Sequence, residues 1–184
     1  DFQGDKGGYI LADIRKQIPV TRADIISWNR LPHPENAPNM GLFSKLSHDG
    51  DYVVTTVNEK PFMITMDQVD FSQLFFPITG HLAVYARKTG RFFLLPGADD
   101  PAFVHTSPVW SPDGRHIIFA RAAVSPRLKA VMGNRRLLMK DIKTPIKDLN
   151  RLYRIRYDLY AIPFNNGRGG TPVPVRGASF NGSS

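Results

Sequence analysis

Five histidines and a small set of carboxylates are the groups in this chain that could do chemistry. The histidines are scattered without the short spacing that is usual for metal ligands, at His33, His48, His81, His105 and His116. Two aspartates each precede a glycine, in Asp49-Gly50 and Asp113-Gly114. A carboxylate in that position could serve as a base, but it is more typical of a tight turn, where it accepts hydrogen bonds from backbone N–H groups.

Asp99 and Asp100 form a local acidic pair in a Gly-Ala-Asp-Asp-Pro loop. Such a pair could bind Ca²⁺, although adjacent carboxylates in this setting more often form a turn. The chain has no cysteine, which excludes disulfides, thiolate metal sites and covalent c-type haem attachment within these residues. It also lacks the GxSxG, Walker, HExxH and dinucleotide fingerprints. We therefore predict a non-enzymatic chain with no catalytic, cofactor-binding or metal-binding residue.

The composition is that of a turn-rich globular domain. The 184 residues are 42% hydrophobic and 22% charged, and glycine and proline contribute 15 residues each. This balance argues against disorder and favours many turns over long helices. No apolar run approaches the ~18 residues that a membrane span needs, so no transmembrane segment is predicted. Because the sequence begins at Asp1, we expect a processed protein or a piece of a longer one.

The sequence contains two copies of one pattern, at an offset of 64 residues. FSKLSHDGDYVVTTV at 43–57 and SPVWSPDGRHIIFAR at 107–121 are each a short strand, an Asp-Gly turn and a β-branched strand. A second Gly-containing hairpin follows each copy, at 81–98 and at 158–178. Two hairpins supply four strands, so each copy predicts one four-stranded antiparallel sheet.

This repeat sets the expected organisation of an all-β chain. Two strands of a preceding unit are predicted at 8–14 and 20–28. The expected parts are residues 1–42 as the end of that unit with a linker, 43–106 as a unit with an apolar insert at 58–80, 107–179 as a unit with a basic insert at 122–156, and 180–184 as the start of a connection to a further unit.

The second copy resembles the repeat of TolB-like β-propellers, the PD40 relatives of WD40 repeats. The resemblance rests on Trp110, on the Ser-Pro-Asp-Gly turn at 111–114 and on the β-branched strand at 117–120, whereas His48 and Thr55 depart from the motif in the first copy. The resemblance implies propeller blades. Closed rings contain about four to eight blades, so two and a half units imply an incomplete ring that is completed from outside this sequence.

A narrower resemblance concerns the segments LPGADDP, DLYAIPFNNGRGG and GASFNG. They are similar to a bacterial TolB-like group whose members are often exported, and some of these carry a haem-binding CxxCH segment upstream of the blades. The resemblance implies a periplasmic or extracellular location.

The insert at 122–156 carries the charge of the chain. It contains ten basic and two acidic residues, a balance of +8 that equals the net charge of the whole sequence. Leu128, Val131 and Met132 recur at helical spacing, which predicts a partly helical segment. The insert is interpreted either as a solvated cover for a sheet edge or as a dock for an acidic protein, an anionic membrane or a polyanion. The predicted partner-binding residues are Arg127, Lys129, Arg135, Arg136, Lys140, Lys143, Lys147 and Arg151.

Among the possible partners we favour a protein, because apolar residues are mixed with the charges and could form a buried centre. Nucleic acid is not predicted, since Tyr153 is nearly alone as a stacking aromatic. The insert at 58–80 is rich in Phe and Met, and it is interpreted either as an exposed docking patch or as a run buried against a neighbouring unit.

The expected function is a non-catalytic propeller scaffold that mediates protein contacts in an exported bacterial complex. The partner is expected to be acidic, and a cytochrome is one candidate. Two alternatives stay open: a propeller module of a haem-containing electron-transfer assembly, and a propeller domain that accompanies a hydrolase. No cofactor is expected in this chain itself.

Overall fold

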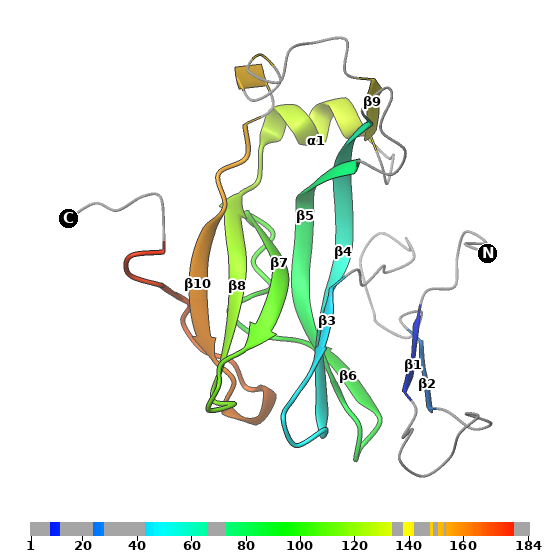
Figure 1. Ribbon diagram of the computed structural model, residues 1–184, viewed down its shortest axis with the longest axis vertical. Coiled ribbons are helices and arrows are strands. Elements are labelled where there is room, and N and C mark those ends of the chain that lie inside the picture. Colours follow the sequence, from blue (N-terminus) through cyan, green and yellow to red (C-terminus); the bar gives the residue numbers. More distant parts are fainter. Residues whose placement is uncertain are drawn as a thin grey trace.

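The computed structural model is a mostly β protein, with one short α-helix among the residues that it describes (Figure 1). The described residues are 8–11, 24–27, 43–65, 73–133, 138–141, 148, 151–152 and 154–178. Two four-stranded antiparallel sheets stand side by side and form the centre of the molecule (Figure 1). The prediction of a β-rich chain built from four-stranded antiparallel units is confirmed at this level.

Sheet one is a meander in which neighbouring strands in the sequence are neighbours in space. It consists of β3 (Ser44–Leu46), β4 (Tyr52–Thr65), β5 (Gln73–Ala86) and β6 (Arg91–Leu94), in that order. A further strand, β9 (Leu138–Asp141), pairs in parallel with the far half of β4. The edge of β4 is therefore occupied by β3 along its first half and by β9 along its second half.

Sheet two has the same plan. Its strands are β7 (Phe103–Trp110), β8 (His116–Ala123), β10 (Asp158–Pro163) and the short β11 (Val173–Pro174), again in simple sequential order. A 3-10 turn, η2 (Asn165–Gly167), lies between β10 and β11. Both predicted hairpins of this unit are thus present.

The two strands that were predicted before the first repeat are also present. They are β1 (Gly8–Leu11) and β2 (Asp24–Ser27), which pair with each other as an antiparallel two-stranded sheet. The rest of the predicted ranges 8–14 and 20–28 lies outside the described residues.

The two sheets repeat each other residue by residue. Leu46 pairs with Val53 across β3 and β4, and Trp110 pairs with Ile117 across β7 and β8. These pairs are related by the same 64-residue offset that the sequence shows. The register agrees because the Asp-Gly turn between the strands has the same length and geometry in both copies.

Each Asp-Gly turn is closed by a serine hydroxyl. Ser47 Oγ donates to Asp49 Oδ1 (2.6 Å) and accepts from the backbone N–H of Tyr52 (2.9 Å). Ser111 Oγ makes the same two bonds, to Asp113 Oδ1 at 2.5 Å and from the N–H of His116 at 2.9 Å. The glycines adopt φ values of 76° at position 50 and 68° at position 114, in the left-handed region that favours glycine.

The main core lies between the two sheets. Sheet one contributes one face of β4 and β5, and sheet two contributes the facing side of β8 and β10; the buried members are Val54, Leu82, Val84, Leu95, Ala98, Ile117, Phe119, Ile162 and Phe164. The ring of Phe164 makes edge contacts with Tyr52 of sheet one and Trp110 of sheet two, each at a centroid distance of 4.8 Å. Burial of this apolar surface is the main force that holds the sheets together.

Polar contacts fix how the repeats are aligned against each other. His48 Nε2 in the first turn donates to the carbonyl oxygen of Ser111 in the second turn (3.0 Å). The indole N–H of Trp110 donates to the carbonyl oxygen of Lys45 on β3 (3.1 Å). The equivalent turns of the two copies therefore lie directly beside each other.

A glycine-lined contact joins the loop after β6 to the loop after η2. The N–H of Gly170 donates to the carbonyl oxygen of Pro96 (3.2 Å). A Cβ atom at Gly169 would lie 2.0 Å from that same oxygen, and one at Gly97 would lie 1.9 Å from the Gly170 oxygen. Two of the segments on which the narrower resemblance rests, LPGADDP and DLYAIPFNNGRGG, thus touch through backbone atoms, and this approach requires glycine.

The segment 58–80, which was predicted as an insert, continues the β4–β5 hairpin. Pairing resumes beyond a bulge between Val57 and Lys60 and runs to Thr65 opposite Gln73. Phe62 and Ile78 are each 2% exposed, so these two apolar side chains are buried rather than part of an exposed patch. Residues 66–72 of the segment lie outside the described residues.

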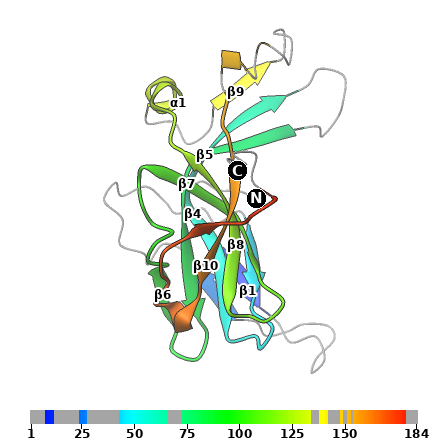
Figure 2. The same cartoon turned by 90° about the vertical axis from the view of Figure 1, so that its left-hand side faces the viewer.

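The basic insert leaves sheet two after β8 and returns at β10. Its first part is α1 (Pro126–Met132), which begins at Ser125, whose hydroxyl accepts from the N–H of Leu128 at 3.3 Å. The prediction of helical structure around Leu128, Val131 and Met132 is confirmed, although Leu128 is buried whereas Val131 is 50% exposed. Both α1 and β9 lie at the same end of the molecule in two perpendicular views (Figures 1 and 2). The strand β9 was not predicted.

Candidate functional site

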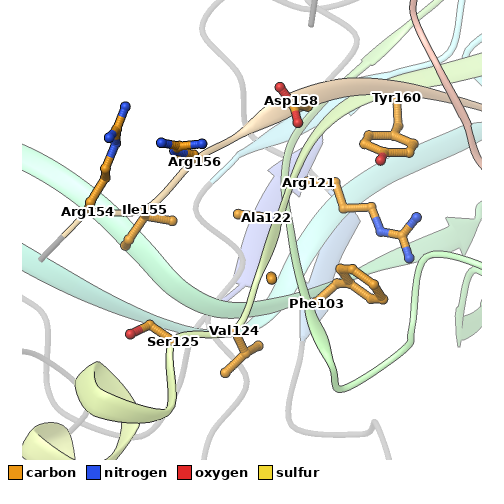
Figure 3. Close-up of a pocket in the computed structure, with 11 residues that line it drawn as sticks. Phe103, Arg121, Ala122, Val124, Ser125, Arg154, Ile155, Arg156, Asp158 and Tyr160 are labelled. Atoms are coloured by element: carbon orange, nitrogen blue, oxygen red, sulfur yellow. The ribbon is translucent and has the colours of Figure 1, made fainter. Parts of the chain in front are cut away.

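The point where the insert joins sheet two forms an open pocket of about 470 Å³ (Figure 3). We call it the arginine pocket. It is lined by the ends of β7 and β8, by the start of the insert and by the segment that leads into β10; its residues are Phe103, Arg121, Ala122, Ala123, Val124, Ser125, Arg154, Ile155, Arg156, Asp158 and Tyr160.

Arg121 on β8 lies between two aromatic rings in this pocket (Figure 3). Its guanidinium carbon is 3.6 Å from the ring centroid of Phe103 on β7 and 5.0 Å from that of Tyr160 on β10. The register explains the arrangement, because Phe103 pairs with Ala123 and Tyr160 pairs with Phe119, which places both rings diagonally beside Arg121. Such cation–π contacts restrain the orientation of the guanidinium.

Arg154 and Arg156 reach the pocket from the segment that precedes β10. They are exposed and alternate with the half-buried residues Ile155 and Tyr157. The Tyr157 hydroxyl donates to the carbonyl oxygen of Pro77 on β5. This bond attaches the arginine-bearing segment to sheet one, and the burial of the phenol raises its pKa above the ordinary value.

The electrostatic balance of the pocket is positive. Three arginines line it together with one carboxylate, Asp158, which is 9% exposed and lies directly opposite Arg121 in the β8–β10 ladder. Three positive charges and one negative charge leave a formal balance of +2. Low-polarity side chains, among them Val124 and Ile155, complete the lining and reduce the screening of these charges by water.

The predicted partner-binding residues are placed as follows. Arg127 and Lys129 are exposed on α1, and Arg151 is exposed and forms an ion pair with Asp148 at 3.7 Å. Lys140 lies on β9, where the backbone alone is described. The remaining members of the predicted set lie outside the described residues: Arg135, Arg136, Lys143 and Lys147.

Sequence reasoning did not select Arg121 as a functional residue. A signal was present, because Arg121 follows Ile117 and Phe119 at the two-residue spacing of the core-facing side of β8. A charged residue at the end of such an apolar face needs either a partner or a route to solvent. Arg154 and Arg156 were counted in the basic insert, but they were not predicted to face a pocket.

The carboxylates that could do chemistry by sequence are engaged in turns. Backbone and hydroxyl donors hold the pKa of Asp49 and of Asp113 below the ordinary value, led in each case by the nearby serine hydroxyl. Asp99 Oδ1 accepts from the N–H of Gly97 (3.0 Å), and Asp100 Oδ1 accepts from the N–H of Ala102 (2.9 Å). Each of these carboxylates therefore accepts a hydrogen bond from a backbone N–H group of its own loop.

A second polar cluster is buried where the sheets meet. Thr106 Oγ1 on β7 donates to Glu59 Oε1 in the β4 bulge (2.7 Å), and burial raises the pKa of Glu59 to about 7. His105 is fully buried, and its ring centroid is 6.2 Å from that of His81. Burial, with His81 and Arg121 nearby, lowers the pKa of His105 to about 4, so this imidazole is neutral at neutral pH.

Within the described residues, no three His, Asp or Glu side chains come together as a metal site would require. In the same part of the chain, no helix combines the length and the apolar character needed to cross a bilayer. No protein-family model matches this chain, and no curated protein matches it by sequence.

Proposed function

We propose that sheet one and sheet two are consecutive blades of a TolB-like β-propeller, and that the chain is a non-catalytic scaffold that docks an acidic protein through its basic insert. The proposal places this scaffold in an exported bacterial complex, a location that rests on the sequence resemblance alone. Two properties of the described residues support it: the way in which the sheets stack, and the position of the exposed charge.

The stacking of the sheets is the observation that carries the proposal. In sheet one, the row that contains Val54, Val84 and Phe93 packs against sheet two. In sheet two, the counterpart of Val54 is Ile118, 64 residues later in the sequence. The row that contains it consists of Val109, Ile118, Ala161 and Val173, which pair directly across all four strands. This second row faces away from sheet one.

The outward row is apolar but uncovered by described residues. On the central strands, Val54 and Val84 of sheet one are fully buried, whereas their counterparts Ile118 and Ala161 are only half-buried. On the outer strands of sheet two, Val109 is 41% exposed and Val173 is 54% exposed. A face that is buried in one repeat and exposed in the next is typical of head-to-tail stacking, in which each unit covers the face of the one before it. A further four-stranded unit of the same kind therefore fits the outward row of sheet two, as propeller blades do.

Thiol accessibility tests this stacking in the assembly purified from its native source. Because the chain contains no cysteine, Val109→Cys introduces its sole thiol. We expect this thiol to be protected from a water-soluble maleimide in the assembly and to react after unfolding. Lys88→Cys is the control, since Lys88 has a side chain 77% exposed and lies outside the row. Rapid labelling of Val109→Cys in the native assembly would contradict the proposal.

The docking role is tested by charge reversal on the insert. Arg127, Lys129 and Arg151 are exposed there, and we expect their joint replacement by Glu to weaken retention of the partner in a salt-dependent way. The control reverses three exposed basic residues of the sheets, namely Lys88, Arg115 and Arg176. Equal retention by both triple variants would show that the insert is a cover and not a dock.

A further inference from the structure

The guanidinium of Arg121 is held in place before any ligand arrives. The rings of Phe103 and Tyr160 restrain it, and its Nε atom is buried without a hydrogen-bond partner among the described residues. A restrained arginine loses less conformational entropy on binding than a free one, and its planar edge matches the two oxygens of a carboxylate. The unused Nε–H adds a donor that an incoming acceptor would satisfy.

Two further arginines line the same pocket, on the other side of Asp158 from the guanidinium of Arg121 (Figure 3). Arg154 and Arg156 are exposed, and neither forms an ion pair with another described residue. The bond from Tyr157 to Pro77 fixes the segment that carries them. Among the described lining residues the pocket therefore has three arginines, of which Arg121 is restrained, and one carboxylate, Asp158.

The remaining lining residues indicate which kind of anion, a carboxylate or a phosphate, fits the pocket better. The formal balance of +2 attracts carboxylates and phosphates alike, so the apolar part of the lining is what favours one over the other. Ala122, Val124 and Ile155 offer apolar surface for the methylene groups of an acidic side chain or for an apolar neighbour. Stacking of nucleobases is not favoured, because Phe103 and Tyr160 already pack against the guanidinium of Arg121.

We propose that the arginine pocket is a carboxylate-binding subsite, which receives an Asp or Glu side chain from a peptide segment that alternates acidic and apolar residues. This inference rests on the proposed function, since the segment would belong to the acidic protein that the insert docks. The arginine at 121 forms the bidentate contact, and Arg154 and Arg156 supply the surrounding positive field.

Binding of defined probes tests the subsite directly. A fluorescein-labelled peptide of alternating Glu and Leu is titrated into the full chain and followed by fluorescence anisotropy. Tripolyphosphate and vesicles of phosphatidylserine with phosphatidylcholine then compete for the site. We expect saturable binding of the peptide and weak competition by both alternatives. Displacement of the peptide by either competitor at a comparable concentration of charge would overturn the assignment to a carboxylate.

Substitutions locate the binding within the pocket. Arg121→Lys keeps the charge but removes the planar fork, and we expect it to weaken peptide binding by about tenfold. Because Arg121 also packs against two rings, the exposed pair is tested as well, and Arg154→Gln with Arg156→Gln is expected to weaken binding by at least tenfold without affecting folding. The matched control is Lys129→Gln with Arg151→Gln, which removes the same charge outside the lining. An equal loss in the control would overturn the subsite.

The two proposals fail in distinguishable ways. If the arginine-pocket variants bind the peptide as the wild type does, the subsite is wrong, whereas the docking role is judged separately by retention of the partner in the triple charge reversal. If the peptide binds through the pocket but the triple reversal keeps its native partner, the subsite stands and the docking role of the insert is wrong.

Discussion

Sheet one and sheet two contain the same two hairpins, yet they differ in the connection between their second and third strands. In sheet one, β4 and β5 simply run on past the bulge as a longer ladder. In sheet two, β8 and β10 stop, and the chain makes the excursion that contains α1 and β9. Additional residues are accommodated at this connection because it lies away from the Asp-Gly turns and outside the rows that form the core between the sheets.

The two additions also contact each other. The strand β9 of the sheet-two excursion pairs with the extension of β4, and Tyr157 binds the Pro77 carbonyl on β5. One part of the basic insert therefore covers a sheet edge, and the proposed docking role concerns another part. The strand β9 occupies a sheet edge, whereas Arg127 and Lys129 on α1 are exposed.

The largest effect is expected where the loops of the two sheets interlock. Gly169 and Gly90 both have φ of 65°, but a Cβ at Gly169 would lie 2.0 Å from the Pro96 oxygen, whereas one at Gly90 would meet nothing within 4 Å. We expect Gly169→Ala to lower the free energy of unfolding by about 4 kcal/mol, and Gly90→Ala by about 1 kcal/mol. Urea denaturation measures both, and equal losses would show that the backbone conformation alone matters.

The next effect concerns pH, because the sheets place groups with opposite responses at their contact. Glu59 of sheet one has a folded-state pKa of about 7 against an ordinary value of 4.5, so its stabilising contribution is full below pH 4.5 and is lost as the pH rises to 7. His105 of sheet two has a folded-state pKa of about 4 against 6.5. Its contribution is full above pH 6.5 and is lost as the pH falls to 4.

Each of these shifts corresponds to about 3 kcal/mol, so the two responses largely cancel between pH 4.5 and 6.5. Single substitutions separate them. Glu59→Gln is expected to leave a stability that rises with pH across this window, with His81 acting in the same direction as His105. His105→Asn is expected to leave a stability that falls with pH. Urea midpoints measured at several pH values test this, and parallel profiles for the two variants would contradict it.

The smallest effect tests whether equivalent positions of the repeat are equivalent in energy. Trp110 binds the Lys45 carbonyl and contacts Phe164, whereas its counterpart Leu46 is 47% exposed. We expect Trp110→Leu to lower the free energy of unfolding by about 2 kcal/mol, and Leu46→Trp to change it by less than about 0.5 kcal/mol. Thermal unfolding of both variants provides the comparison, and a loss of similar size in both would show that the two positions contribute equally.

The local structure of this chain was predictable because it depends on residues close in sequence. The pairs Asp49-Gly50 and Asp113-Gly114 predicted the turns, since a glycine that accepts positive φ and a short carboxylate determine such geometry locally. The strands β1 and β2 and the helical spacing of Leu128, Val131 and Met132 in α1 followed from pattern as well. The 64-residue offset predicted that the sheets would share a plan, and the register of Leu46 with Val53 and of Trp110 with Ile117 agrees with it.

Other features depended on contacts between distant segments, which a single sequence does not encode in any local pattern. The pairing of β9 with β4 joins residues more than 70 positions apart. The close approach of Gly169 to Pro96 could not be predicted from the sequence either. The segment 58–80 was interpreted as an insert, whereas it continues the β4–β5 ladder beyond a bulge, and a bulge breaks the alternation that marks a strand in the sequence. Composition determined that the insert is basic. Tertiary structure alone decided that Arg121, Arg154 and Arg156 line one pocket, because that depends on where β8 ends and β10 begins.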